Sequence, residues 1–306
     1  MKISVIFTGG TIGSKTEDTT VSLGTAPYTL LEGAVYNGVI FDCFEPYTVL
    51  SEEMTADRLR TLADSVRGHL DSCDGIIVTH GTDSLVYSAA FLGYLFADTP
   101  VPIVLVSSGY PLDDPRANGR QNFSAAVGLI RSGEKGVFVT WTADGVSKVH
   151  RGVRLLRQLP YTDMLTSLSG GSTQGVPMPC PDDLSGFGRT VYLTVQPSMW
   201  YPKLDESVSA VLMVSYHSGT LCADERFAAF MKSADKLGIP VFIAGAGGRD
   251  ADYETVRKYR DLGAVPLPMA SPDAMYVKLC LAASLASDAE GIRKTMLTGF
   301  AGDFAE

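Results

Sequence analysis

The chain has 306 residues, of which 45% are hydrophobic and 19% charged, and its formal net charge is −9. This balance is typical of a globular protein, and the length favours two domains. Lysine and arginine are not clustered as phosphate binding requires, so nucleic acid is not expected as a partner. No apolar run is long enough to span a membrane, so no membrane association is expected. The N-terminus lacks the pattern of a secretory leader, and the five scattered cysteines have no C-x-x-C spacing, which together predict a cytoplasmic protein with reduced thiols.

The N-terminal residues 2–7 form an apolar run rich in β-branched residues, which predicts a buried strand. Residues 8–13, with the sequence TGGTIG, follow directly and place two hydroxyls and two adjacent glycines at the strand's carboxyl end. Ligands bind at that end of an open α/β sheet, and glycines let them approach the backbone closely. The spacing does not fit a dinucleotide fingerprint, because Thr8 stands where the first glycine should be, and it does not fit a phosphate-binding loop. A catalytic turn and a plain strand-to-helix turn are equally good interpretations of this stretch alone.

The next segment, residues 14–26, is polar and without periodicity, which predicts a mobile surface loop. Residues 39–44 predict a second strand. An amphipathic helix is expected after Thr55, which can cap it, because leucine and valine recur at helical spacing from Leu59 to Leu70.

A second polar turn follows the strand predicted at residues 75–79. Its sequence, HGTDS at residues 80–84, again puts hydroxyls at a strand end, here with a carboxylate beside them, before an apolar helix at residues 85–96. Thr82, Asp83 and Ser84 are also good helix-capping residues, which is the alternative interpretation. If the two threonine-bearing turns meet, they can act on one carbonyl carbon.

The remaining elements alternate between strand and helix. Strands are predicted at residues 101–106 and 137–142, with a helix ending near Arg131 between them, which predicts a mostly parallel sheet with right-handed crossovers. A Gly/Ser/Pro-rich stretch then predicts a domain boundary. We therefore expect an α/β fold with an N-terminal domain at residues 1–170, a linker at 171–188 and a smaller α/β domain at 189–306.

The second domain is expected to contain three strands and three helices. The strands are predicted near residues 191–195, 210–215 and 240–244, and the helices near 224–236, 253–262 and 273–286. The last helix is expected to be apolar on one face only.

The TGGTI and HGTDS stretches resemble the paired signatures of the bacterial-type L-asparaginases of the cytosolic type, including the asparaginase-glutaminases. Their order and spacing fit, and the similarity continues through residues 50–54, 151–154 and 277–296. The resemblance implies an amidohydrolase without cofactor or metal that converts L-asparagine, or L-glutamine, to the acid and ammonia. It also implies a homodimer or homotetramer.

The resemblance further implies catalytic roles for residues of both turns. Thr11 would be the nucleophile, Thr82 the second hydroxyl, and Asp83 the group that orients Thr82 and helps bind the ammonium group. A loop tyrosine would close over the substrate; Tyr28 is the candidate, and Tyr36 remains an alternative.

Four further residues would bind the substrate. Ser51 and Glu52 would hold its amino-acid end, since a hydroxyl can donate to a carboxylate and a carboxylate can accept from an ammonium group. Gly81 would help stabilise the oxyanion, and the backbone carbonyl of Ser108 would accept the amide. Glu52 and its neighbour Glu53 can equally be solvated charges in front of a helix.

One position departs from the family pattern, because Arg157 stands where a lysine is expected after residues 151–154 (RGVR). A guanidinium stays protonated and cannot take a proton from Thr82, although it can stabilise negative charge or bind Asp83. Lys148 lies nearby in sequence, but there is no geometric reason to give it the role of the missing lysine. Arg157 can also form a salt bridge that has no part in the chemistry. Two alternatives therefore stay open: a non-catalytic amino-acid-binding homologue, and an amidase for a larger or D-configured amide.

The histidines give little support for other chemistry. His80 and His217 are interpreted as structural, the first as fixing the turn at residues 80–84. Neither a G-x-S-x-G nor an H-E-x-x-H motif is present, which disfavours serine hydrolases of that fold and zinc proteases.

Overall fold

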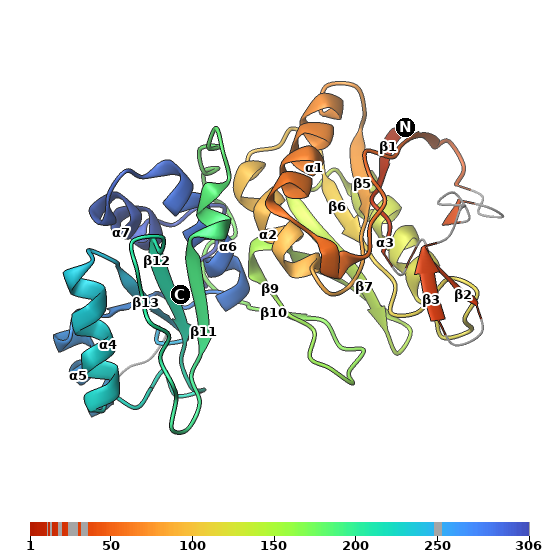
Figure 1. Ribbon diagram of the computed structural model, residues 1–306. Helices are drawn as coiled ribbons and strands as arrows, with labels where there is room; N and C mark the ends of the chain where they lie inside the picture. The colour runs from red at the N-terminus through yellow and green to blue at the C-terminus, as the bar shows by residue number, and fades with distance from the viewer. Residues whose placement is uncertain are drawn as a thin grey trace. The chain divides into compact units, whose positions relative to one another are not determined.

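The computed structural model describes residues 1–10, 12, 14–17, 20–23, 30–31, 36–247 and 253–305. The chain divides into two compact units, Met1–Ser167 and Leu168–Glu306. Both units combine helices with a parallel sheet, so the predicted α/β fold class is confirmed (Figure 1). No helix within the described ranges is long and apolar enough to cross a membrane.

The main sheet of the first unit has the strand order β4-β1-β5-β6-β7-β8. Its strands are β1 (Lys2–Phe7), β4 (Ile40–Phe44), β5 (Gly75–Thr79), β6 (Ile103–Val106), β7 (Val137–Ala143) and β8 (Val146–Arg151). All neighbours are parallel except β7 and β8, which form an antiparallel hairpin that the sequence did not predict. The chain leaves β1 toward one side to form β4 and then crosses to β5 on the other side. The carboxyl end of β1 is therefore the topological switch point, where ligands bind in sheets of this kind.

Helices cover both faces of this sheet: α1 (Ala56–His69) and α2 (Leu85–Leu95) one face, and α3 (Gly119–Ser132) the other (Figure 1). Phe123 and Val127 of α3 pack with Val104 on one side, whereas α2 approaches Val137 on the opposite side. The crossovers β5-α2-β6 and β6-α3-β7 step in the same direction with their helices on opposite faces, so they have opposite hands. The expectation of right-handed crossovers is therefore wrong for one of these two.

The expectation of a loop at residues 14–26 is also wrong in part. The strands β2 (Ser14–Glu17) and β3 (Thr20–Leu23) pair antiparallel. Threonine and valine favour extended backbone even where no alternating pattern marks a strand.

Short elements complete the first unit. They are the 3-10 helices η3 (Ser51–Glu53) and η4 (Gly152–Arg154) and the antiparallel pair β9 (Leu155–Leu156) and β10 (Thr166–Ser167). The pair closes the base of residues 157–165, a segment that contributes to the site described below.

The second unit is built on a parallel sheet with the order β11-β12-β13-β14. Its strands are β11 (Thr190–Thr194), β12 (Ala210–Val214), β13 (Val241–Ala244) and β14 (Val265–Pro266), and its helices are α4 (Glu225–Lys236), α5 (Glu254–Asp261), α6 (Pro272–Leu285) and α7 (Ala289–Leu297). The residues predicted as a linker, 171–188, fall in this unit. They include η5 (Ser185–Gly188), where the Gly186 N–H donates to Ser284 Oγ of α6 at 3.0 Å. The assignment of domain boundaries stays a prediction.

Helix α6 is buried on all sides, not on one face as expected. It even buries a charge, because the Lys278 ammonium lies 2.8 Å from a carboxylate oxygen of Asp303 and donates to the Thr298 carbonyl at 2.6 Å. Both side chains of the ion pair are fully buried, and Nζ lies 4.3 Å from the ring centre of Phe304. This pair fixes the C-terminal segment to α6, an arrangement that a hydrophobicity pattern cannot reveal.

Candidate functional site

The first polar turn follows β1 and is held between two neighbouring segments. The Gly10 N–H donates to the Val49 carbonyl at 2.9 Å, and the Val49 N–H donates to the Thr8 carbonyl at 3.1 Å. The Thr8 hydroxyl donates to the Thr79 carbonyl at the end of β5 at 2.6 Å. These bonds fasten the turn after β1 to the strand that carries the second turn.

The two turns touch through glycine backbone. Gly10 has a φ of 77°, and a Cβ placed on it would lie 2.3 Å from both Cα and N of Gly81. A Cβ on Gly81 would lie 2.6 Å from the side chain of Ser51. Any side chain at these two positions would push the turns apart, so both glycines are required for the close approach.

Ser51 connects the segment after β4 to the second turn. Its hydroxyl accepts from the Asp83 N–H at 3.2 Å and donates to Asp83 Oδ2 at 3.3 Å. The Ser84 hydroxyl donates to the Ser51 carbonyl at 2.6 Å. Ser51 is only 5% exposed, so this arrangement orients Asp83 from a buried anchor.

Helix capping does not account for the second turn. Ser84 is the N-cap residue of α2, but its side chain makes no capping hydrogen bond and is directed to Ser51 instead. Thr55, by contrast, caps α1 as expected by accepting from the Arg58 N–H.

A cavity of about 400 Å³ in the first unit brings together three of the predicted catalytic residues. Thr82, Asp83 and Arg157 all line it, although they are up to 75 positions apart in the sequence (157 − 82 = 75). Thr82 is half-buried, whereas Asp83 and Arg157 are exposed. The other described lining residues are Leu85, Val86, Tyr87, Gln158, Leu159, Pro160, Tyr161, Thr162 and Leu165. The cavity thus combines a hydroxyl, a carboxylate and a guanidinium with an apolar wall.

Most of that apolar wall comes from residues 158–165, which follow Arg157 and were not assigned to the site from the sequence. The segment is held internally, because the Gln158 side-chain amide donates to the Thr162 carbonyl at 2.8 Å. It is held to the sheet by Trp141 of β7, whose indole N–H donates to the Asp163 carbonyl at 2.8 Å. No sequence pattern marks these long-range contacts.

Other predicted residues lie elsewhere. Glu52 is exposed on η3 and is not among the described residues that line the cavity, and neither is Lys148, which is exposed on β8. Ser108 is fully buried; its hydroxyl donates to the Tyr110 carbonyl at 2.5 Å and accepts from the Gly119 N–H at 3.2 Å.

The predicted nucleophile Thr11 and the predicted loop tyrosine Tyr28 lie outside the described residues. The alternative tyrosine, Tyr36, packs against Phe41 and Phe123, with ring centres 5.5 and 5.8 Å apart. Tyr36 is thus part of an aromatic cluster on the α3 face of the sheet.

His80 supports the second turn from inside. It is 1% exposed, and its Nδ1 lies 2.8 Å from the Gly81 carbonyl, to which it must donate. Burial lowers the pKa of the imidazole below its usual value, so the ring is neutral near pH 7. A neutral, inward-facing ring agrees with the structural role expected for it.

Comparison with known proteins shows which family the chain resembles. The sequence model of the family described as Asparaginase, N-terminal, matches residues 2–162. An L-asparaginase of Thermococcus kodakarensis is 26% identical over 329 aligned residues, which cover 99% of both chains. A glutamyl-tRNA(Gln) amidotransferase subunit of Methanosarcina acetivorans is 34% identical over 168 residues, which are 50% of this chain but only 38% of the amidotransferase chain.

Solved structures share the fold over the whole chain. The thermostable L-asparaginase of Thermococcus kodakarensis superposes with a TM-score of 0.79 at 22% identity, covering all of both chains. L-asparaginase I of Vibrio cholerae superposes with a TM-score of 0.76 at 20% identity, covering 100% of this chain and 99% of the other. The family match spans more than half of the chain and includes both polar turns. The chain belongs to the asparaginase family.

Proposed function

We propose that the unit Met1–Ser167 hydrolyses the side-chain amide of L-asparagine, with L-glutamine as a second substrate. The observation that carries the proposal is the cavity lined by Thr82, Asp83 and Arg157, together with the close contact of Gly10 and Gly81 between the two polar turns. The matched L-asparaginase of Thermococcus kodakarensis, aligned over nearly its full length, supports this substrate class.

The reaction would proceed through an ester. The Thr11 hydroxyl attacks the amide carbon, its proton passes to the departing nitrogen, and ammonia leaves. Water then cleaves the ester, which regenerates the hydroxyl and releases the acid. Tyr28 would close over the bound substrate and polarise Thr11.

The described residues would bind and orient the substrate. Asp83, held by Ser51, presents a carboxylate that can accept from the ammonium group of an amino acid. Thr82 supplies the second hydroxyl, and Arg157 supplies positive charge to the developing oxyanion. Gly81 would provide a backbone amide, Glu52 would bind the amino-acid end, and the Ser108 carbonyl would accept the amide.

The test is ammonia release from L-asparagine and L-glutamine by the purified protein and by Arg157→Lys. Turnover by the parent would support the proposal and would mean that a base other than the side chain at 157 acts. Turnover by Arg157→Lys alone would mean that the guanidinium disables an otherwise intact site. If neither protein released ammonia from either substrate, the proposal would be overturned.

A second candidate is binding without turnover, which the guanidinium at position 157 favours because it cannot act as a base. A general base contributes a factor of about 10² to 10⁴ to such reactions. Calorimetry with L-aspartate and L-asparagine separates the candidates, because a binding protein would take up both without releasing ammonia. A third candidate is an amidase for a larger or D-configured amide, and the 34% identity with an amidotransferase subunit over 50% of this chain supports the larger amide.

We also propose that the protein is cytoplasmic and assembles as a homodimer or homotetramer. Light scattering coupled to size-exclusion chromatography tests the assembly. A monomer at micromolar concentration would contradict that part of the proposal.

A further inference from the structure

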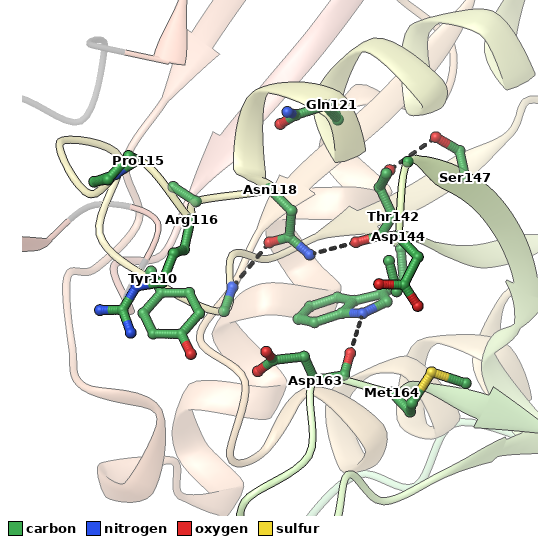
Figure 2. A pocket seen from close by; sticks show the side chains of 15 residues that line it. Tyr110, Pro115, Arg116, Asn118, Gln121, Thr142, Asp144, Ser147, Asp163 and Met164 are labelled. Atoms are coloured by element: carbon green, nitrogen blue, oxygen red, sulfur yellow. Dashed lines mark hydrogen bonds between the residues drawn. The ribbon is translucent and has the colours of Figure 1, made fainter.

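A second cavity of about 400 Å³ lies in the first unit, between the turn that follows β6 and the β7–β8 hairpin (Figure 2). The residues that matter for its chemistry are Tyr110, Asn118, Trp141, Asp144, Asp163 and Met164. None of the described residues assigned above to amide hydrolysis lines it. Its size falls within the range of small-molecule sites, which starts at about 300 Å³.

The walls of this cavity are held in place by hydrogen bonds that Figure 2 shows. The Asn118 amide accepts from the Gly109 N–H at 2.9 Å and donates to the Thr142 carbonyl at 2.8 Å, so one side chain ties the β6 turn to the end of β7. The Thr142 and Ser147 hydroxyls bond across the hairpin at 2.8 Å. The cavity is therefore formed before any ligand arrives.

The lining of this cavity is mostly polar, and a smaller part of it is aromatic or apolar. Trp141 is 2% exposed and its indole N–H is bonded to the Asp163 carbonyl, so its ring adds only a small carbon surface to the lining. Tyr110 and the thioether of Met164 add to this surface. This smaller apolar part can pack against the stem of a ligand.

The residues that line the cavity carry more negative than positive charge. Asp144 and Asp163 both line it and are exposed. Asp144 lies in the hairpin turn with a φ of 51°. The positive charge among the described lining residues is that of Arg116.

Arg116 is already engaged. Its guanidinium binds Asp114 through two bonds, of 3.0 and 2.7 Å, and its Cζ lies 3.9 Å from the ring centre of Tyr110. Two carboxylates, those of Asp144 and Asp163, therefore line the cavity with one guanidinium whose charge Asp114 already balances. The excess of negative charge would repel an anionic ligand and attract a cationic one.

We propose that this cavity is a binding site for a small organic cation, an ammonium or guanidinium group on an apolar stem. The stem lies along Tyr110 and Met164, and the charged group bonds to the carboxylates of Asp144 and Asp163. The lining residues differ from those of the cavity proposed for amide hydrolysis, although the two cavities share the segment 157–165.

Tryptophan fluorescence gives a direct assay, because the chain has two tryptophans and one of them, Trp141, lines the cavity. Trp200 is 77% exposed in the other unit, so Trp200→Phe leaves a single reporter at the site. In this background, agmatine and n-butylamine are titrated beside neutral n-butanol and anionic butyrate, with calorimetry as a second reading. We expect saturable binding of the two cations with a Kd of about 1 mM or lower and no saturable binding of the other two.

Variants then locate the binding. Asp144→Asn with Asp163→Asn should weaken it about tenfold or more, since each carboxylate contributes a charge-assisted bond. Asparagine tolerates the left-handed conformation at position 144, so the hairpin turn is preserved. Asp98→Asn, an exposed carboxylate beyond α2, should leave the affinity unchanged.

One more probe, Nα-acetyl-lysine amide, distinguishes a lysine side chain of another protein from a free amine as the natural ligand. Tighter binding than agmatine would identify a protein side chain as the natural ligand, and weaker binding a free amine. The proposal is overturned if neither method detects the cations, if butanol or butyrate binds as well, or if the double variant binds agmatine with parental affinity.

Discussion

Gly10→Ala tests whether the close approach of the two polar turns is needed for activity. The new Cβ would stand 2.3 Å from Gly81 Cα and N, whereas ordinary van der Waals contact begins at 3.4 Å, so the turns would have to separate by about 1.1 Å (3.4 − 2.3). A displacement of about 1 Å at a reacting group can lower a rate about 10²-fold. We therefore expect Gly10→Ala to lose activity by about that factor.

The effect on stability has two parts that can be separated. Alanine at a φ of 77° costs about 1–2 kcal/mol from the left-handed backbone alone, and overpacking against a neighbour adds about 1–3 kcal/mol. Gly38 and Gly133 have φ values of 74° and 73° but nothing within 4 Å of an added Cβ. Gly38→Ala and Gly133→Ala therefore report the backbone cost without the contact.

The assay is urea unfolding of all three variants, together with ammonia release at a temperature where each is folded. Gly10→Ala should be about 1–3 kcal/mol less stable than either control variant, and only Gly10→Ala should lose activity. Equal stability of the three variants, with parental activity in Gly10→Ala, would refute the proposed contact between the turns.

Three further outcomes are expected. Lys278→Met leaves Asp303 buried without its counter-ion and should lower the free energy of unfolding in urea by about 3–5 kcal/mol. Adding Asp303→Asn should recover part of that stability, and no recovery would contradict the ion pair. Cys180 and Cys222 are exposed and should react first with an aromatic disulfide at pH 8, whereas burial raises the pKa of Cys280 to about 12, so this thiol should react only after unfolding. Hydrogen bonds from Arg116 lower the pKa of Asp114 from 3.8 to about 2. The contribution of Asp114 to stability is therefore present above pH 3.8 and is lost as the pH falls toward 2. Between pH 6 and pH 2, the melting temperature of Asp114→Asn should fall by less than that of the parent.

The strands of the main sheet can be predicted because buried parallel strands are continuous apolar runs. Residues 75–79 and 103–106 are completely buried, and both fall within predicted strands. Strand β8 escapes prediction because its first four residues, 146–149, are exposed and do not alternate. Helix α6 is more buried than expected because Lys278, a charged residue in the sequence, is buried with its ion-pair partner Asp303. That partner lies 25 positions away, so the pairing cannot be seen in the sequence of the helix.

The site is predictable where it rests on the two polar turns. Thr82 and Asp83 are expected beside Arg157, and the structure brings all three to one cavity. The wall formed by residues 158–165 cannot be predicted, because the indole bond from Trp141 that holds it depends on tertiary contacts. The cavity near Tyr110 escapes prediction for the same reason, since its walls come from three segments.

The most direct measurement is ammonia release from L-asparagine by the parent protein, Thr82→Ala and the control Thr55→Ala. Thr55 caps α1 through its hydroxyl, so its variant tests for a general effect of losing a threonine. We expect turnover by the parent and by Thr55→Ala, and a loss of about 10² or more in Thr82→Ala. Parental turnover by Thr82→Ala would contradict the assignment of the Thr82 cavity as the catalytic site.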